Sequence, residues 1–344
     1  MRNKEFGSDF HYSSDYEFRS KATDKRHDLN NMDYLYFSGR VALRNILING
    51  INQFNWKKIY VPTYYCHEVY DFIKDLHIEL EFYQCNPLNN TLPDHIEDSN
   101  LYVILLVDYF GVSSPDFDHL KDIITIKDLT HNLSLIGSSK ADYIFGSLRK
   151  ILPIPVGGFV KSKIKLPEIP CTLFAEDVAM EKFTGMFLKK KYLEGNFSEK
   201  EIFRDLLISA EHSFENIETN SALPFIVKEY LLELDISKII ECKKNNIFIM
   251  KNTIKETPKF ELLTGNSGLE YSLILKFTDT EEREKLKKYL ITHNIYPMVL
   301  WPNQFSEDDI RLQNSLLFIH IDFRYTTADM KYIANFINQF SSNA

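Results

Sequence analysis

Short apolar runs alternate with helical patterns in the first half of the chain. The longest run, Leu101–Val107, is apolar or aromatic throughout. Continuous runs of this kind, separated by segments with helical spacing, are typical of parallel strands buried on both faces. The pattern therefore predicts a layered α/β domain with a mostly parallel central sheet. Strands are expected at residues 58–61, 79–83, 101–107, 123–126 and 143–145, with a helix at 68–76.

The pattern changes in the second half. Residues 172–220 are charged and helical in spacing, and residues 226–256 predict one long amphipathic helix, because their apolar positions recur every three or four residues. Strands and helices then alternate in a way that predicts a smaller α+β domain. These elements are strands at 271–277 and 316–323 and helices at 280–290 and 327–340. We expect an N-terminal extension (1–33), a large domain (34–245) and a small C-terminal domain (246–344).

Composition narrows the function. A formal net charge of −8 argues against nucleic acid as a partner, because such a partner requires a basic surface. Glycine is scarce, and neither a dinucleotide-binding nor a P-loop glycine motif occurs. The four cysteines are scattered, which predicts reduced thiols and no metal site. No long apolar run or signal peptide is apparent, so we expect a cytoplasmic protein with no membrane association.

Three polar clusters follow the predicted strands or open a helix. The first is Ser38-Gly39-Arg40, at the start of an apparent helix. Free backbone N–H groups at a helix N-terminus bind phosphate, and Arg40 could add charged hydrogen bonds. A plain helix cap at Ser38 is the alternative.

The second cluster is Asp128 with His131, directly after the strand at 123–126. A carboxylate at a strand end can pair with a pyridinium nitrogen and keep that ring protonated. His131 could bond the phenolic oxygen of the same ring. A capping aspartate with an incidental histidine is the alternative.

The third cluster contains Ser147, Arg149 and Lys150, between the strand at 143–145 and a loop rich in proline and glycine. A lysine that forms a Schiff base must be neutral part of the time, and burial or a neighbouring cation such as Arg149 lowers its pKa. Ser147 could contact a phosphate. A surface Arg-Lys pair is the alternative.

The order of phosphate turn, acidic residue and lysine is that of a fold-type-I site for pyridoxal 5′-phosphate (PLP). From Phe37 to about Phe340 the chain resembles the DegT/DnrJ/EryC1/StrS family of sugar aminotransferases. The segments that carry the resemblance are FSGRVAL, YVPTYYC, LLVDYFG, IKDLTH and ADYIFGSLRKILPIPVGG.

The resemblance implies a PLP-dependent transferase fold of type I, with Lys150 as the catalytic residue that bonds the cofactor covalently. It implies that Asp128 contacts the ring nitrogen and His131 the ring oxygen. The phosphate would be held by Ser38, Gly39, Arg40 and Ser147, and the ring would stack near Cys66 or His67.

The resemblance also implies an aminotransferase that takes an amino group from L-glutamate and gives it to a keto-sugar, linked to a nucleotide, in amino-sugar or surface-polysaccharide biosynthesis. The family usually forms homodimers with shared active sites. His67 and Tyr109 are candidate substrate contacts. Arg324 is a third, because His320, Asp322 and Arg324 would share one face of the strand at 316–323, unless that face is simply solvated. A small phosphorylated or carboxylated ketone, other PLP chemistry and a non-catalytic sensor with the same fold are the alternative functions.

Overall fold

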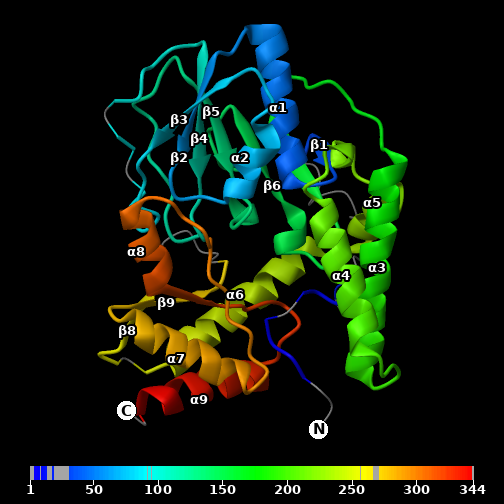
Figure 1. Cartoon of the computed structure of the whole chain (residues 1–344), viewed down its shortest axis with the longest axis vertical. Coiled ribbons are helices and arrows are strands. Elements are labelled where there is room, and N and C mark those ends of the chain that lie inside the picture. The colour runs from blue at the N-terminus through cyan, green and yellow to red at the C-terminus, as the bar shows by residue number, and fades with distance from the viewer. Residues whose placement is uncertain are drawn as a thin grey trace.

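A mixed sheet of seven strands forms the centre of the large domain in the computed structural model, which describes residues 4–7, 9–13, 18, 31–90, 92–93, 95–255, 257–265 and 271–342 (Figure 1). The strands are β1 (Tyr34–Tyr36), β2 (Lys58–Pro62), β3 (Glu79–Tyr83), β4 (Tyr102–Val107), β5 (Ile124–Asp128), β6 (Tyr143–Ser147) and β7 (Gly158–Ser162). Their order across the sheet is β1-β7-β6-β5-β4-β2-β3.

The central strands of this sheet are parallel. β2, β3, β4, β5 and β6 all run in one direction, whereas β7 runs against both of its neighbours, β6 and β1. Because parallel strands end at the same edge, the segments that follow β2, β5 and β6 meet there. The predicted α/β class with a mostly parallel sheet is confirmed. The apolar runs identified β2 to β6 correctly, and β1 and β7 were not predicted.

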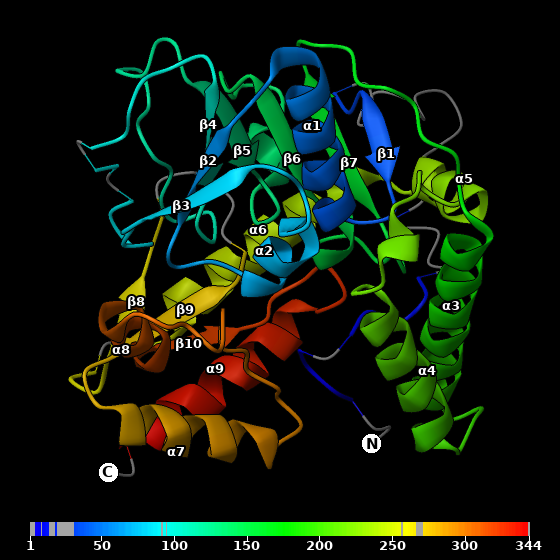
Figure 2. The same ribbon diagram turned by 45° about the horizontal axis from the view of Figure 1, so that its top comes forward.

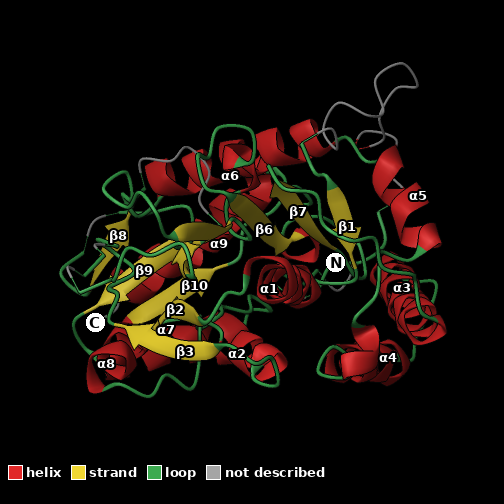
Figure 3. Cartoon of the chain, turned by 90° about the horizontal axis from the view of Figure 1, so that it is seen from above, coloured by secondary structure: helices red, strands yellow, loops and turns green. Residues whose placement is uncertain are grey.

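Helices flank the sheet. They are α1 (Gly39–Phe54), α2 (His67–Ile73), α3 (Leu173–Glu194), α4 (Lys200–Ser213) and α5 (Phe225–Glu233), with short 3₁₀ turns at residues 133–135, 148–150 and 217–219. α1 packs against β6 and β7, and α3 packs along α4. Figures 2 and 3 show α3, α4 and α5 grouped on the β1 side of the sheet.

The single long helix expected at 226–256 is wrong. The structure has two helices, α5 and α6 (Ile236–Thr253), because Leu234 adopts an extended conformation between them. The side chain of Asp235 accepts a hydrogen bond of 2.9 Å from the N–H of Lys238 and so caps the second helix. The apolar spacing continues across the break between α5 and α6, so the sequence pattern alone did not reveal that Asp235 is a capping residue.

The small domain contains a three-stranded antiparallel sheet. Its strands are β8 (Phe260–Leu263), β9 (Leu273–Phe277) and β10 (Leu316–Ile319), with β9 in the middle. Its helices are α7 (Thr280–Ile291), α8 (Glu307–Ser315) and α9 (Thr327–Ser342). The predicted strand at 316–323 therefore ends at Ile319, four residues early.

α6 contributes residues to two different hydrophobic clusters. Ile239 packs in the cluster beneath the large sheet, whereas Ile247 and Met250 pack in a second cluster with the small sheet. The boundary predicted after residue 245 falls inside this helix. No helix among the described residues is long and apolar enough to cross a membrane.

The N-terminal segment lies between the small domain and α3 (Figure 1). Phe6 exchanges backbone hydrogen bonds with Asn294 and Tyr296 of the small domain, at 2.9 and 2.8 Å. The N–H of Tyr12 donates to the carbonyl of Met186 in α3 at 3.1 Å. The first residues thus bridge two parts of the molecule. Most of the predicted extension (residues 1–33) lies outside the described residues.

Gly158 offers a test of the packing between β7 and α1. A Cβ at this position would lie 2.2 Å from the carbonyl carbon and oxygen of Ser38. We expect Gly158→Ala to lower the free energy of unfolding by about 1–3 kcal/mol, because backbone must move. Gly137→Ala is the control, since nothing lies within 4 Å of its Cβ. Urea denaturation measures both, and equal stability of the two variants would contradict the close approach.

Candidate active site

A pocket of about 310 Å³ opens at the carboxyl ends of the parallel strands, between the two domains. Tyr271, Leu300 and Trp301 of the small domain form one wall. The other wall comes from the large domain and contains every residue expected to contact the cofactor. These are Ser38, Gly39, Arg40, Cys66, Asp128, His131, Ser147 and Lys150.

Lys150 ends the 3₁₀ turn that follows β6. The hydrogen bond of 2.9 Å from the N–H of Leu148 to the carbonyl of Gly157 closes the loop that carries it. Solvent in the pocket reaches its amine, and no described residue bonds to it. The neighbouring Arg149 guanidinium and the surrounding protein lower the pKa of Lys150 to about 8. A substantial fraction of the amine is therefore neutral near physiological pH.

Asp128 is the last residue of β5 and is buried. Its Oδ1 accepts a hydrogen bond of 2.7 Å from the N–H of Thr130, and its Oδ2 accepts one from the hydroxyl of Tyr65. Burial raises the pKa of Asp128. Each carboxylate oxygen can accept two hydrogen bonds, so Asp128 keeps capacity for a further donor in the pocket.

His131 is stacked among aromatic rings. Its ring centroid lies 4.2 Å from that of Tyr271 and 5.3 Å from that of Trp301, with the Trp301 ring nearly parallel to it. Burial, together with the positive charges of Lys150 and Lys243, lowers the pKa of His131 to about 3. The imidazole is therefore neutral, and one of its nitrogens can donate a hydrogen bond while the other accepts one.

The N-terminus of α1 closes the large-domain end of the pocket. The hydroxyl of Ser38 accepts a hydrogen bond of 3.3 Å from the N–H of Val41, so this side chain caps the helix. No described residue accepts a hydrogen bond from the N–H groups of Gly39 or Arg40. A Cβ at Gly39 would lie 3.1 Å from the backbone nitrogen of Ser147, so the two segments approach closely.

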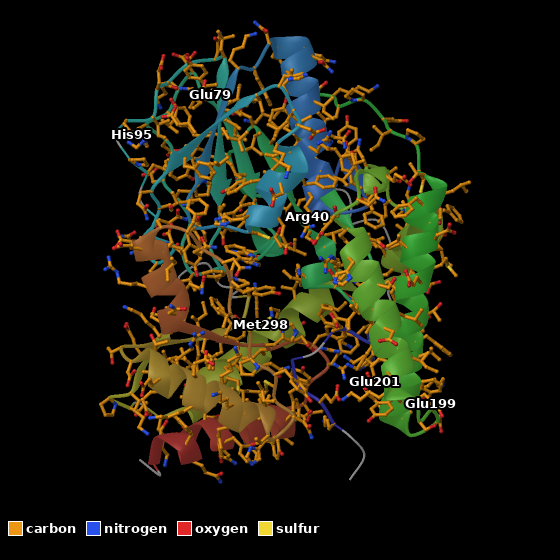
Figure 4. The ribbon with its side chains drawn as sticks, viewed as in Figure 1. Arg40, Glu79, His95, Glu199, Glu201 and Met298 are labelled. Atoms are coloured by element: carbon orange, nitrogen blue, oxygen red, sulfur yellow. The ribbon has the colours of Figure 1, made fainter. Side chains whose placement is uncertain are left out.

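Arg40 lies at the end of α1 that faces the small domain (Figure 4). Met298, which is labelled in the same figure, belongs to the small domain. Its guanidinium forms an ion pair with Glu68, which also lines the pocket. Helix N–H groups without acceptors, beside an arginine and the hydroxyl of Ser147, fit an anion of the size of phosphate.

Two predicted substrate contacts lie outside the pocket wall. His67 follows Cys66 but points away, with Nε2 at 3.1 Å from the carbonyl oxygen of Thr63 and its ring stacked on Phe305 at 4.4 Å. Tyr109 is fully buried and donates a hydrogen bond of 2.6 Å to the carbonyl of Tyr64. Of the two candidates for ring stacking, Cys66 is therefore the one that faces the pocket.

The arrangement expected around Arg324 is wrong, because β10 ends before His320. The three polar residues converge on Asp322 instead. Its Oδ2 lies 2.9 Å from Nε2 of His320 and 2.7 Å from Nη2 of Arg324. The guanidinium also covers the ring of Phe10 at 4.6 Å. This face is neither solvated nor directed into the pocket.

Among the pocket residues that sequence reasoning missed are Tyr65, Glu211, Tyr271 and Trp301. Trp301 is held by its loop, because the hydroxyl of Tyr64 donates to the carbonyl of Leu300 at 2.6 Å. Trp301 is one of only two tryptophans in the chain and stands next to a proline, and this combination could have indicated that it belongs to the site. Glu211 and Tyr271 stand in ordinary helical and strand patterns, which gave no such signal.

The fold is that of sugar aminotransferases. CalS13 from Micromonospora echinospora, titled a sugar aminotransferase, superposes with a TM-score of 0.59 at 10% identity, over 96% of this chain and 98% of its own. PseC from Helicobacter pylori, titled an aminotransferase involved in the biosynthesis of pseudoaminic acid, gives 0.61 at 12% identity, over 99% and 100%. Spr1654 from Streptococcus pneumoniae, solved in a PLP form, gives 0.59 at 12% identity, over 95% and 93%.

No protein-family model and no curated protein matches the sequence. Because the identities to the solved structures are this low, the similarity establishes a shared fold, as the sequence resemblance led us to expect. The chemistry has to be argued from the pocket itself.

The lowered pKa of Lys150 can be measured without a cofactor. Its acetylation by acetic anhydride, followed by mass spectrometry, should rise through about pH 7–8 and level off above about pH 9, because the amine is then fully neutral. Ordinary exposed lysines in the same sample should become more reactive up to about pH 10 or beyond. If Lys150 follows their profile, the environment described here does not act on it.

Proposed function

We propose that this chain is a PLP-dependent aminotransferase that moves an amino group from L-glutamate to a keto-sugar, with a nucleotide-linked sugar as the favoured acceptor. One observation carries the proposal. The amine of Lys150, to which no described residue bonds, lies in the same pocket as the Asp128 carboxylate and the N-terminus of α1. A covalent anchor, a partner for a ring nitrogen and a phosphate site are the three contacts that this cofactor needs.

When bound, PLP would supply an electron sink for negative charge on the substrate carbon. The N–H groups of Gly39 and Arg40 and the hydroxyl of Ser147 would hold its phosphate. Asp128 would hold the proton on the ring nitrogen, and the neutral His131 would donate to the ring oxygen. Lys150 would bond the cofactor covalently and would hold and move a proton at Nζ.

The fold supports a sugar as the acceptor. The structural neighbours CalS13 and Spr1654, which are described as sugar aminotransferases, are consistent with a role in amino-sugar or polysaccharide biosynthesis. We also propose a homodimer in the cytoplasm, with each site completed by the partner chain. Cys66, which faces the pocket, would lie against the cofactor ring.

A smaller acceptor is the second candidate. The cavity of about 310 Å³ is near the lower limit for ligand pockets, and the cofactor must share it with the substrate. Trp301 forms part of the small-domain wall of this cavity. A small phosphorylated or carboxylated ketone would fit without movement of the loop around this residue. Retention of both Lys150 and Asp128 argues against a non-catalytic sensor.

An absorbance spectrum tests the cofactor and the donor together. Protein incubated with PLP should turn yellow, and L-glutamate should shift the band to that of the pyridoxamine form. Lys150→Ala should fold normally and lose the band, because no amine remains to bond the cofactor. An unchanged band in that variant would refute the assignment of Lys150, and a wild-type band that does not respond to glutamate would refute the donor.

Asp128 can be tested through turnover. Asp128→Asn should still bind PLP but slow the glutamate half-reaction by about 10²–10³-fold, because the amide no longer stabilises a protonated ring nitrogen. Stopped-flow absorbance measures the rate, and the exposed Asp118 serves as the matched control in Asp118→Asn. A rate within a few-fold of wild type would show that another group holds the ring nitrogen.

A further inference from the structure

Arg149 lines the same pocket as Lys150 and uses few of its hydrogen-bond donors. Its Nη1 donates to Oε1 of Glu211 at 2.8 Å, and its guanidinium carbon lies 4.4 Å from the ring centroid of Phe214. Among the described residues, no group accepts a hydrogen bond from Nε, which is buried, or from Nη2. A guanidinium has five N–H donors, and those on Nη2 remain available to a ligand in the pocket.

The surroundings of Arg149 carry an excess of positive charge. Lys182 of α3 is only 5% exposed, and its ammonium bonds to the same Glu211 oxygen. Burial raises the pKa of Glu211, but Arg149 and Lys182 outweigh that effect and lower it to about 2, so the carboxylate stays ionised. One carboxylate therefore faces two cationic side chains, Arg149 and Lys182, and the partly neutral Lys150 is the next residue along the chain from Arg149. An uncompensated buried cation is costly, and an anion in the pocket would relieve this cost.

Arg149 lines the pocket together with Lys150 and with Tyr271 of the small-domain wall. Its positive charge lowers the pKa of Lys150. Glu211 and the ring of Phe214 hold the guanidinium in place, and both residues also line this cavity. A guanidinium held in this way is suited to bind the oxygens of a carboxylate. Arg324, the arginine that the sequence suggested as a substrate contact, is bound to Asp322 instead.

We propose that Arg149 is the specificity-determining residue that binds the carboxylate of the amino donor beside Lys150, with Glu211 as the residue that positions it. This inference rests on the proposed function and deepens it, since it assigns the residue that recognises the carboxylate of the donor. Glu211 competes with the donor for the same guanidinium, so the two side chains have opposite effects on binding.

Calorimetric titration with glutarate tests this opposition, because glutarate carries the carboxylates of glutamate without its amino group. Arg149→Gln should weaken glutarate binding by about ten-fold or more. Glu211→Gln should strengthen it several-fold, since it keeps the shape of the side chain and removes the competing charge. Arg204→Gln, an exposed change on the same helix as Glu211, should leave binding unchanged. Thermal unfolding of each variant verifies that the protein is folded.

Three results would overturn the proposal. Glutarate binding that is independent of Arg149 would exclude the carboxylate site. Weaker binding in both Arg149→Gln and Glu211→Gln would show a purely structural ion cluster. Inorganic phosphate, titrated in parallel, would reveal a third case: if only phosphate binding depends on Arg149, this residue belongs to the cofactor-phosphate cradle.

The absorbance experiment with PLP separates this inference from the proposed function. A yellow band together with Arg149-independent glutarate binding would disprove the carboxylate site alone. Arg149-dependent glutarate binding without a band would disprove the cofactor assignment, while the anion site itself would stand.

Discussion

The antiparallel pairing of β6 with β7 is the constraint on which the site depends. It sets Ser147 opposite Gly158 in the sheet, so the loop between the two strands must turn back and present Lys150 at the edge where the parallel strands end. The same register brings Gly158 against the carbonyl of Ser38, and thereby fixes the N-terminus of α1 beside the lysine. The hairpin of β6 and β7 thus determines the distance between Lys150, the proposed covalent anchor, and the N-terminus of α1, the proposed anion site. The lack of a side chain at Gly158 makes this contact possible.

Most of the large sheet could be predicted from the sequence because its central strands are buried on both faces. Such strands need continuous apolar runs, and Leu101–Val107 is the clearest of them. β1 has only three residues, and β7 has only two consecutive apolar residues, Phe159 and Val160, so neither strand forms a comparable run. The break between α5 and α6 was hidden for a different reason. The apolar spacing persists through Leu234 and Asp235, and the capping role of Asp235 depends on a backbone conformation that periodicity does not report.

The residues of the candidate site also fall into those that the sequence predicted and those that it did not. Residues at or just after a strand end, such as Asp128 and Lys150, could be identified because strand ends converge in parallel sheets. Glu211 and Tyr271 reach the pocket through tertiary packing of segments distant in sequence, and no local pattern marks them. Arg324 is the opposite case, because it was predicted to contact the substrate but does not line the pocket. A suitable residue type was assigned to the pocket, although the chain leaves the strand after Ile319 and the guanidinium turns to Asp322.

The N-terminal segment described above acts as a tether. It is hydrogen-bonded to the small domain at Phe6 and to α3 at Tyr12, and the chain between these two points can extend to about 20 Å at most. Any hinge motion that opens the pocket by moving the small domain away from α3 must stay within that reach or detach one end. The amplitude of opening is therefore limited by the first dozen residues, which lie far from the reacting groups along the chain.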